Sequence, residues 1–317
     1  MGRRSSRASA PGARVLVTDS LATVGVERLE QAGVEVRWLP ADERTRLAEH
    51  AAEVDALIIR TATRVSAELL DAAPRVRVVG RAGAGLDNVD VPAASARGVS
   101  VVSAPEANAV AAAEHTFALL LALARGVALG DRQLKHGSWH PDQPLGFELN
   151  GKILGVVGFG RIGQRVARRA RVFGMDIRIV DPVIDERACA DVEARVCADL
   201  NELLPSVDVL TLHVPLDETT RCMIAARELA QMRSGSVLVN CARGGVVDEK
   251  ALLDCLESGH LRGAALDVFA REPPVDPQLA AHPRVVATPH WGAHTEEAKR
   301  RVALEIADNV LAALRQH

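Results

Sequence analysis

Ile153-Leu154-Gly155-Val156-Val157-Gly158-Phe159-Gly160-Arg161-Ile162-Gly163 joins a short apolar run to three glycines in the spacing G-x-G-x-x-G. The apolar residues that follow, as far as Phe173, recur at helical spacing, and a second apolar run, 177–180, ends on Asp181. This pattern predicts a strand, a tight turn, a helix and a second strand that ends in an acid. The order is typical of a dinucleotide-binding unit, whereas the three glycines alone would be weak support.

Each glycine of this stretch has its own expected role. Gly158 makes the turn, Gly160 lets the backbone approach a pyrophosphate, and Gly163 lets the helix lie close to the sheet. The helix N-terminus offers N–H groups and a partial positive charge to the phosphates. Asp181 is placed to accept hydrogen bonds from both hydroxyls of a ribose and would repel a 2′-phosphate. We therefore expect NAD as the cofactor in preference to NADP.

The length and composition are those of a globular protein. The 317 residues are enough for two domains, 48% of them are apolar, 25% are charged, and the formal net charge is −3. This charge gives no reason to expect a nucleic-acid partner, and no apolar run approaches the roughly 20 residues that span a bilayer. We expect a soluble, cytoplasmic protein without a membrane partner. Residues 1–13 are expected to be a disordered extension, not an export signal or a lipidation site.

The cysteines predict neither disulfides nor a metal site. They show no C-x-x-C spacing and fall within helical or strand patterns: Cys189, Cys197, Cys222, Cys241 and Cys255. We expect reduced thiols in a cytosolic protein. Cys241 lies beside Arg243 without a base near it in the sequence, so a packing role is favoured over a nucleophilic one.

Short apolar runs alternate with helical patterns along the chain, which predicts an α/β protein with two doubly wound parallel sheets. Strands are expected at 15–17, 34–36, 56–59, 76–79 and 99–102, and again at 153–157, 177–180, 208–212, 236–239, 263–266 and 285–287. A final helix, 295–315, is expected to pack back on the first unit. The predicted domains are a flavodoxin-like substrate domain, 14–104 plus 294–317, and a Rossmann NAD-binding domain, 105–293, inserted in it.

Residues 107–135 are predicted to form one long helix. Its stretch from Phe117 to Ala124 is apolar on every side, so we expect it to be buried between domains or between subunits. Ligands of open α/β sheets bind at the carboxyl ends of the strands, and the cleft between the two domains is therefore the expected binding site.

Three reactive side chains follow predicted strands of the second unit. Arg243 lies in a glycine-containing turn, Glu272 precedes two prolines, and His290 follows Pro289. A 2-oxo acid reductase needs this set. Arg243 can bind a carboxylate through two parallel hydrogen bonds, and His290 can protonate the carbonyl oxygen as hydride arrives. A carboxylate beside the histidine, that of Glu272, favours the protonated imidazole ring.

Each of these residues also has a simpler interpretation. A lone arginine is usually a surface or ion-pairing residue, a glutamate before proline a turn residue, and a histidine after proline a cap. Their joint placement after strands of one dinucleotide-binding domain favours the catalytic interpretation. Of the other histidines, His115 and His213 are expected to be hydrogen-bonded structural groups, and His50, His136, His260 and His282 to be solvated.

From about Val15 to Leu314 the chain resembles the D-isomer-specific 2-hydroxy acid dehydrogenases. The resemblance is carried jointly by the stretches RTAT (60–63), GRAGAGLDNVD (80–90), AAAEHT (111–116), GFGRIG (158–163), NCARGGVVDE (240–249) and TPH (288–290). It implies an NAD-dependent oxidoreductase in which Arg243, Glu272 and His290 are the catalytic residues. It also implies a homodimer formed through the NAD domain, with the helix 107–135 in the interface.

The resemblance further implies which residues contact each ligand. NAD contacts are expected at Gly158, Gly160, Arg161, Ile162, Gly163, Asp181, Val214, Cys241, Ala242, Arg243, Asp267, His290, Gly292 and Ala293. A small anionic 2-hydroxy or 2-oxo acid is expected to contact Arg60, Arg81, Gly83, Asn108, Arg243 and His290. From the residues alone, Arg60 and Arg81 would only be strand-end cations able to pair with an anion or with Asp87 and Asp90.

The expected reaction is hydride transfer between NAD and C2 of a D-2-hydroxy acid with a second anionic group, and 3-phosphoglycerate is the leading candidate. Two departures favour a related anion instead, such as a phosphonate or another hydroxy acid. The cations usual after Trp139 are replaced by His140-Pro141-Asp142-Gln143-Pro144, and Trp291 and His294 stand where Leu and Ser are common. The chain ends after its last helix, so no regulatory domain is expected. A non-catalytic NAD-sensing corepressor is a third hypothesis, and it would not require the catalytic residues.

Overall fold

The computed structural model describes residues 12–143 and 146–317, and within them the chain divides into two compact units. Unit 1 comprises the residues up to Asn108 together with His294–His317, and unit 2 comprises Ala109–Ala293. The sequence predicts domain boundaries after residues 104 and 293, and the two units divide after residues 108 and 293. Most of the expected disordered extension, 1–13, lies outside the described residues, but Ala13 is buried in the core of unit 1.

Unit 1 is a doubly wound parallel sheet with the strand order β2-β1-β3-β4-β5. The strands are β1 (Arg14–Val17), β2 (Glu35–Trp38), β3 (Ala56–Ile59), β4 (Val78–Arg81) and β5 (Ser100–Ser103). The helices are α1 (Thr23–Glu30), the 3-10 helix η1 (Ala41–Arg46), α2 (Leu47–Ala51), α3 (Ala67–Ala72), α4 (Val91–Ala96) and α13 (Glu296–Leu314). This is the flavodoxin-like order, and the direction of winding changes between β1 and β3.

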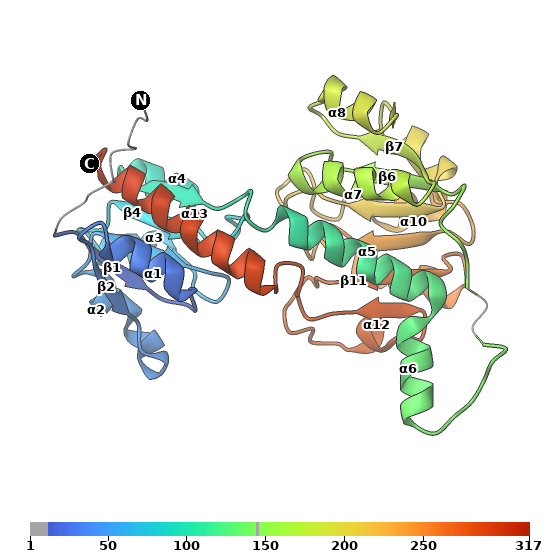
Figure 1. Ribbon diagram of the computed structural model, residues 1–317, viewed down its shortest axis with the longest axis horizontal. Coiled ribbons are helices and arrows are strands. Elements are labelled where there is room, and N and C mark those ends of the chain that lie inside the picture. The colour runs from blue at the N-terminus through green and yellow to red at the C-terminus, as the bar shows by residue number, and fades with distance from the viewer. Residues whose placement is uncertain (1–11, 144–145) are drawn as a thin grey trace, which may run out of the picture. The chain divides into compact units, whose positions relative to one another are not determined.

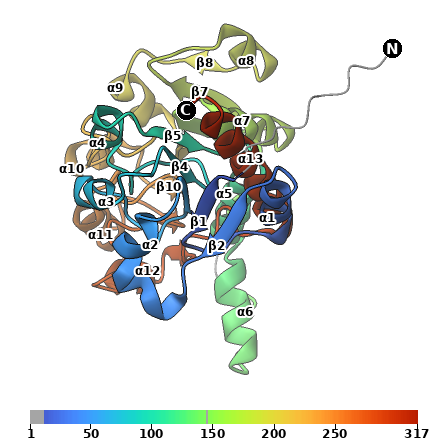
Figure 2. The ribbon, with the colours of Figure 1, turned by 90° about the vertical axis from the view of Figure 1, so that its left-hand side faces the viewer.

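The core of unit 1 has two layers, one on each face of the sheet. The helices α1 and α13 cover one face, while α2 and α3 lie on the other (Figure 2). The predicted return of the final helix is confirmed, since α13 packs on α1 and β4. Gly25 makes the close helix contact possible, because a Cβ there would lie 2.6 Å from the carbonyl oxygen of Ala303.

Unit 2 is a seven-stranded parallel sheet with the order β12-β11-β10-β9-β6-β7-β8. Its strands are β6 (Ile153–Val157), β7 (Asp176–Val180), β8 (Arg195–Val196), β9 (Val209–Leu212), β10 (Val237–Asn240), β11 (Gly263–Leu266) and β12 (Val285–Ala287). Counted from β6, this is the strand order of dinucleotide-binding folds with one further strand at the edge, and the winding changes between β6 and β9. The predicted two-sheet α/β architecture is thereby confirmed.

Helices cover both faces of the sheet of unit 2. They are α5 (Ala109–Arg125), α6 (Val127–Lys135), α7 (Arg161–Val172), α8 (Glu186–Asp191), α9 (Leu200–Leu203), η2 (Leu204–Ser206), α10 (Ala226–Gln231), α11 (Glu249–Glu257) and α12 (Gln278–Ala281). One core layer contains α5 and α7, which lie side by side (Figure 1), and the other contains α9, α10 and α11.

The predicted single helix over 107–135 is wrong, because two helices, α5 and α6, meet at Gly126. Gly126 has φ 61°, a left-handed conformation that only glycine adopts readily, and the axis bends by 66° there. The apolar surface of α5 packs on α7 and on the strands β10–β12 of its own unit. Contacts within unit 2 therefore explain the burial of this surface. They require neither a contact with the other domain nor one with a second subunit, which the sequence suggested.

Among the described residues, no single helix is both long enough and apolar enough to cross a membrane. Only α5 and α6 taken together reach the required length and composition, and the pair is bent at Gly126.

Candidate active site

The glycine-rich turn lies at the carboxyl end of β6, where the winding of unit 2 changes. Gly158 has φ 89°, and a Cβ on it would lie 2.6 Å from the carbonyl oxygen of His213, which follows the neighbouring strand β9. A Cβ on Gly163 would lie 2.1 Å from the carbonyl oxygen of Gly158. Both positions therefore exclude any side chain, which confirms the close packing expected of the turn and of α7.

The N-terminus of α7 is shaped to receive an anion. Gly160 is its N-cap residue, and no side chain caps the first turn, which contains Arg161 and Ile162. A Cβ on Gly160 would project into open space. Helix N-termini of this kind attract phosphates through their N–H groups and the helix dipole, so these residues fit a pyrophosphate.

Asp181 follows β7 directly and faces the glycine-rich turn. Its Oδ2 accepts a hydrogen bond from the N–H of Phe159 at 2.5 Å, and its Oδ1 accepts one from the N–H of Val183 at 2.7 Å. A carboxylate has about four lone-pair positions, so it can still accept hydrogen bonds from ribose hydroxyls. The residues present therefore fit the NAD that the sequence predicts.

The segment after β9 brings His213 and Val214 to the same edge of the sheet. The Nε2 of His213 lies 3.0 Å from the Oγ1 of Thr211, as expected of a structural histidine. The residue is half-buried but its ring is enclosed, and burial lowers the pKa of His213 to about 3. The ring is therefore neutral at physiological pH.

The structure brings His290 and Glu272 together as a hydrogen-bonded pair. The Nδ1 of His290 lies 2.7 Å from the Oε2 of Glu272, and the two side chains are 38% and 33% exposed. The Oε1 of Glu272 accepts a hydrogen bond from the N–H of Phe269 at 3.3 Å. Because Nδ1 faces the glutamate, Nε2 is the nitrogen left to exchange a proton with a substrate.

Arg243 lies in a tight turn after β10, and the buried side chain of Asn240 stabilises this turn. The amide of Asn240 donates to the carbonyl of Arg243 at 3.0 Å and accepts from the N–H of Ala242 at 3.0 Å. Gly244 lets the turn contact the segment after β11, because a Cβ there would lie 1.8 Å from the carbonyl oxygen of Phe269. Sequence reasoning did not assign this role to Asn240.

Asp267 follows β11 and binds the segment that carries His290. Its Oδ1 lies 2.7 Å from the N of Trp291, and its Oδ2 lies 2.8 Å from the N of Gly292, which Ala293 follows. The same carboxylate contacts His115 on α5, which was expected to be structural only and had not been connected with the site.

Cys241 is a packed, inert thiol, as the sequence suggested. Burial raises the pKa of Cys241 to about 12, although a hydrogen bond with Thr116 acts in the opposite direction. Three further histidines differ from their prediction as solvated groups. His282 is half-buried, and its Nδ1 accepts a hydrogen bond from the N–H of Arg284 at 3.2 Å. His50 is half-buried against Glu43, and His260 against the carbonyl of Leu229.

The remaining predicted substrate residues all belong to unit 1. Arg60 follows β3 at the point where the winding changes, and Asp19 accepts a hydrogen bond from its N–H at 2.8 Å. The guanidinium of Arg81 lies over Gly83, where a Cβ would be 1.6 Å from its Nη1. The Oδ1 of Asn108 is buried without a hydrogen-bond partner among the described residues. The guanidinium of Arg60 donates to the hydroxyl of Ser20 at 3.1 Å, and that of Arg81 to the hydroxyl of Thr61 at 3.4 Å.

Residues 117–292 match the family described as D-isomer specific 2-hydroxyacid dehydrogenase, NAD binding domain. This chain belongs to that family. The match covers more than half of the chain and lies within unit 2, which is therefore the NAD-binding domain. The resemblance recognised in the sequence is thereby confirmed.

Individual relatives agree with the family. D-3-phosphoglycerate dehydrogenase of Mycobacterium leprae (strain TN) is 46% identical over 300 residues, which are 95% of this chain and 56% of that protein. This chain spans about half the length of the curated relatives it matches. A glyoxylate reductase from Paecilomyes thermophila has a similar structure, with a TM-score of 0.88, 33% identity and 97% coverage of both chains. D-lactate dehydrogenase from Aquifex aeolicus, complexed with NAD and lactic acid, has a TM-score of 0.84 and 28% identity, with 95% and 96% of the chains covered.

Cys241 should not react with a thiol reagent in the folded protein. With a pKa of about 12, only about one in 10⁴ of its thiols is ionised at pH 8, and the thiolate is the reactive form. Colorimetric thiol titration should show a fast phase that Cys222→Ser removes, since Cys222 is exposed. Cys241→Ser should leave that phase intact, and its loss in this variant would contradict the packing role.

Proposed function

We propose that this protein catalyses reversible hydride transfer between NAD and C2 of a D-2-hydroxy acid that carries a second anionic group. The observation that carries the proposal is the pair of His290 and Glu272, 2.7 Å apart, at the edge of the sheet that also holds the glycine-rich turn. Structural ion pairs are also common on protein surfaces. This one follows two neighbouring strands of an NAD-binding domain, where ligands of such folds bind.

The residues have distinct roles in the proposed reaction. NAD, when bound at the α7 N-terminus and Asp181, supplies or receives the hydride. Arg243 binds the substrate carboxylate and polarises the adjacent carbonyl. Nε2 of His290 donates a proton to the carbonyl oxygen during reduction and removes it during oxidation. Glu272 holds the ring in place through its hydrogen bond with Nδ1.

We propose 3-phosphoglycerate as the leading substrate, with Arg60 and Arg81 binding its second anion together with Gly83 and Asn108. The name of the curated relatives and the position of Arg60 at the winding change of unit 1 support this choice. The alternative substrate is a related anion such as a phosphonate, because the cations usual after Trp139 are absent from the sequence of residues 140–144. Residue 144 itself lies outside the described residues. The corepressor hypothesis is less favoured, since it does not require the pair of His290 and Glu272.

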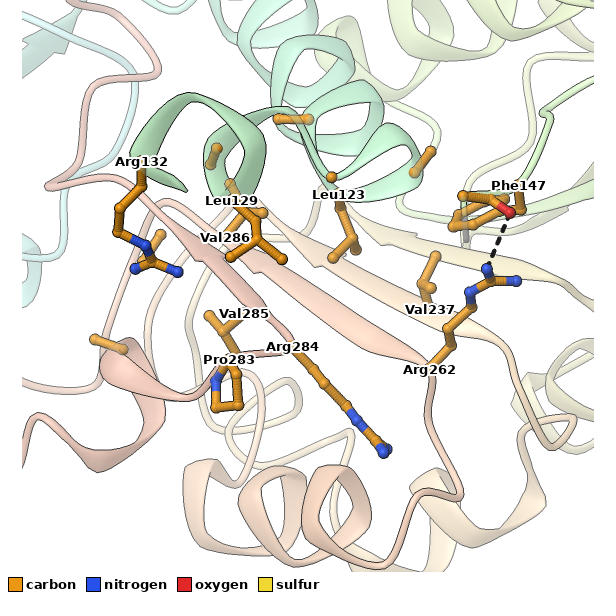
Figure 3. A pocket seen from close by; sticks show the side chains of 17 residues that line it. Leu123, Leu129, Arg132, Phe147, Val237, Arg262, Pro283, Arg284, Val285 and Val286 are labelled. Carbon is orange, nitrogen blue, oxygen red and sulfur yellow. Dashed lines mark hydrogen bonds between the residues drawn. The ribbon is translucent and has the colours of Figure 1, made fainter. Parts of the chain in front are cut away.

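We further propose that the protein forms a homodimer through unit 2. Val127 and Leu134 are seven residues apart on one side of α6, with Asp131 between them. Both apolar side chains are 58% exposed, and a second copy would bury them. Beside α6 lies a pocket of about 350 Å³, lined by Leu123, Leu129, Val285 and Val286 (Figure 3). Arg132, Arg262 and Arg284 stand around it, and Arg262 donates to the carbonyl of Gly146. Val237 at the amino end of β10 and Arg262 just before β11 line the pocket, and none of its lining residues is a candidate active-site residue.

The homodimer predicts a solution mass twice the 33.8 kDa of one chain. Leu134→Glu should shift the protein toward the monomer in sedimentation, because a charge would be buried in the interface. Val172→Glu is the matched control, since Val172 is 88% exposed on α7. A monomeric parent protein, or equal behaviour of the two variants, would contradict this interface.

NAD should be strongly preferred over NADP. The carboxylate of Asp181 would face the 2′-phosphate as a like charge, which costs a few kcal/mol. Asp181→Asn removes the charge and keeps an acceptor oxygen, so it should narrow the ratio of kcat/KM for the two cofactors. Asp191→Asn, on the exposed end of α8, should leave that ratio unchanged. Similar kcat/KM values for NAD and NADP in the parent enzyme would contradict the role of Asp181.

His290→Ala should lower kcat by a factor on the order of 10² to 10⁴, since general acid-base catalysis is lost, while NADH binding stays nearly intact. Glu272→Gln should be less damaging and should shift the pH profile. Without the carboxylate the protonated ring is less favoured, so reduction should lose half its rate at a lower pH than in the parent. Fluorescence titration of NADH is the control for folding. An unchanged pH profile in Glu272→Gln would remove this residue from the proposed mechanism.

A substrate panel followed by NADH absorbance tests the second anion. Glycerate and lactate should be far poorer substrates than 3-phosphoglycerate or a phosphonate analogue, because remote binding positions C2. Arg60→Ala should narrow this gap by about 1.5–3 kcal/mol, the range for a hydrogen bond to a charged group. Arg97→Ala, which removes an exposed arginine paired with Asp71, should not. Equal efficiency on all acids would leave a general D-2-hydroxy acid dehydrogenase.

A further inference from the structure

The segment that carries His290 has a conformation that its own sequence does not favour. His290 has φ 57°, in the left-handed region that residues other than glycine rarely adopt, and such a residue costs about 1 kcal/mol or more. The backbone on both sides must therefore be held by contacts from elsewhere in unit 2. Within the segment from Thr288 to Gly292, the N–H of His290 donates to the carbonyl of Thr288 at 3.1 Å, and the same N–H also has a partner outside the segment.

Asp267 accepts hydrogen bonds from three backbone N–H groups of this segment. Its carbonyl accepts from the N–H of His290 at 2.8 Å, and its carboxylate accepts from the N–H groups of Trp291 and Gly292 at 2.7 and 2.8 Å. The residue is only 1% exposed. Burial alone would raise the pKa of Asp267, but hydrogen bonds from His115, Thr288 and Trp291 hold it below the ordinary value. The carboxylate is therefore charged at neutral pH, and a charged acceptor makes the stronger hydrogen bonds.

His115 completes this arrangement from the opposite side. It lies on α5, and its Nε2 is 3.1 Å from the Oδ1 of Asp267 and 2.9 Å from the Oγ1 of Thr288. The hydroxyl of Thr288 in turn donates to the same Oδ1 at 2.5 Å. An ionised carboxylate only accepts hydrogen bonds, so Nε2 of His115 carries a hydrogen in this contact.

We propose that His115 is a positioning residue for His290: through Asp267 and Thr288 it fixes segment 288–292 so that the Nδ1 of His290 meets Glu272. His115 therefore does more than stabilise the core. Of its two partners, Thr288 belongs to the segment that carries His290, and Asp267 binds that segment. Its ring is on a helix that packs on the same strands, β11 and β12, whose ends carry Asp267 and Thr288. The rate readouts below rest on the proposed function, whereas the spectroscopic readout does not.

The decisive comparison is between His115→Met and His115→Gln. Methionine is similar in length but has no N–H donor, while the Nε2 of glutamine can replace that of histidine. His115→Met should lower kcat on the order of tenfold, the effect of one hydrogen bond to a charged group, and should change the affinity for NADH less. The pH at which reduction loses half its rate should fall. His115→Gln should restore both values towards those of the parent enzyme.

His260→Met is the matched control, because His260 is also a half-buried histidine of unit 2 but binds the carbonyl of Leu229. If His115 contributed to stability alone, His115→Met would behave like His260→Met. Each variant would have a lower melting temperature, and the pH profile of the folded enzyme would be unchanged. A parent-like kcat and pH profile in His115→Met would overturn the proposal. If His115→Met does not fold, Thr288→Val removes the other side-chain donor to Oδ1 and carries the same test.

Nitrogen-15 NMR of the histidine rings separates this inference from the proposed function. The Nδ1 proton of His290, bonded to Glu272, should give a downfield resonance in the parent and in His115→Gln, and should shift or exchange away in His115→Met. This outcome would support positioning even if no acid in the substrate panel were turned over. An identical resonance in all three proteins would overturn it.

Discussion

The buried carboxylate of Asp267 is the interaction on which the candidate active site of unit 2 depends. A charge that is 1% exposed would be costly without partners, and here donors from α5 and from the segment after β12 surround it. The same bonds hold the backbone around His290 in a left-handed conformation. One buried charge thereby joins a helix, a strand end and the proposed acid-base residue, and its hydrogen bonds stabilise an otherwise unfavourable local geometry.

Parallel pairing explains why the other candidate residues gather at one edge. The carboxyl ends of β6, β7, β10, β11 and β12 all face the same way, so the glycine-rich turn, Asp181, Arg243, Asp267 and His290 lie along a single edge of the sheet. Close backbone approaches at Gly158, Gly163 and Gly244 allow these segments to meet. The pocket beside α6 lies near the amino ends of β10 and β11. The arginines that line it are Arg132, Arg262 and Arg284.

The fold supports the redox chemistry more strongly than it supports one substrate. Similar structures include a glyoxylate reductase and a D-lactate dehydrogenase, so the same two sheets serve different acids. Discrimination among acids has to come from side chains, and we propose this role for Arg60, which follows β3, and for Arg81, which ends β4.

The sequence by itself determined the two parallel sheets, the glycine-rich turn and the candidates Arg243, Glu272 and His290, because strand periodicity and turn chemistry act over a few neighbouring residues. Gly126 was visible in the sequence as a weak helix former, but only packing in the structure decided that the predicted helix bends there.

The roles of Asn240 and His115 could not be predicted. His115 and Asp267 are 152 residues apart, and nothing in either local pattern indicates the other. Tertiary structure alone decided that contact. The packing of α5 on β11 and β12 brings the imidazole of His115 to the buried carboxylate of Asp267, which would otherwise have one hydrogen-bond donor fewer.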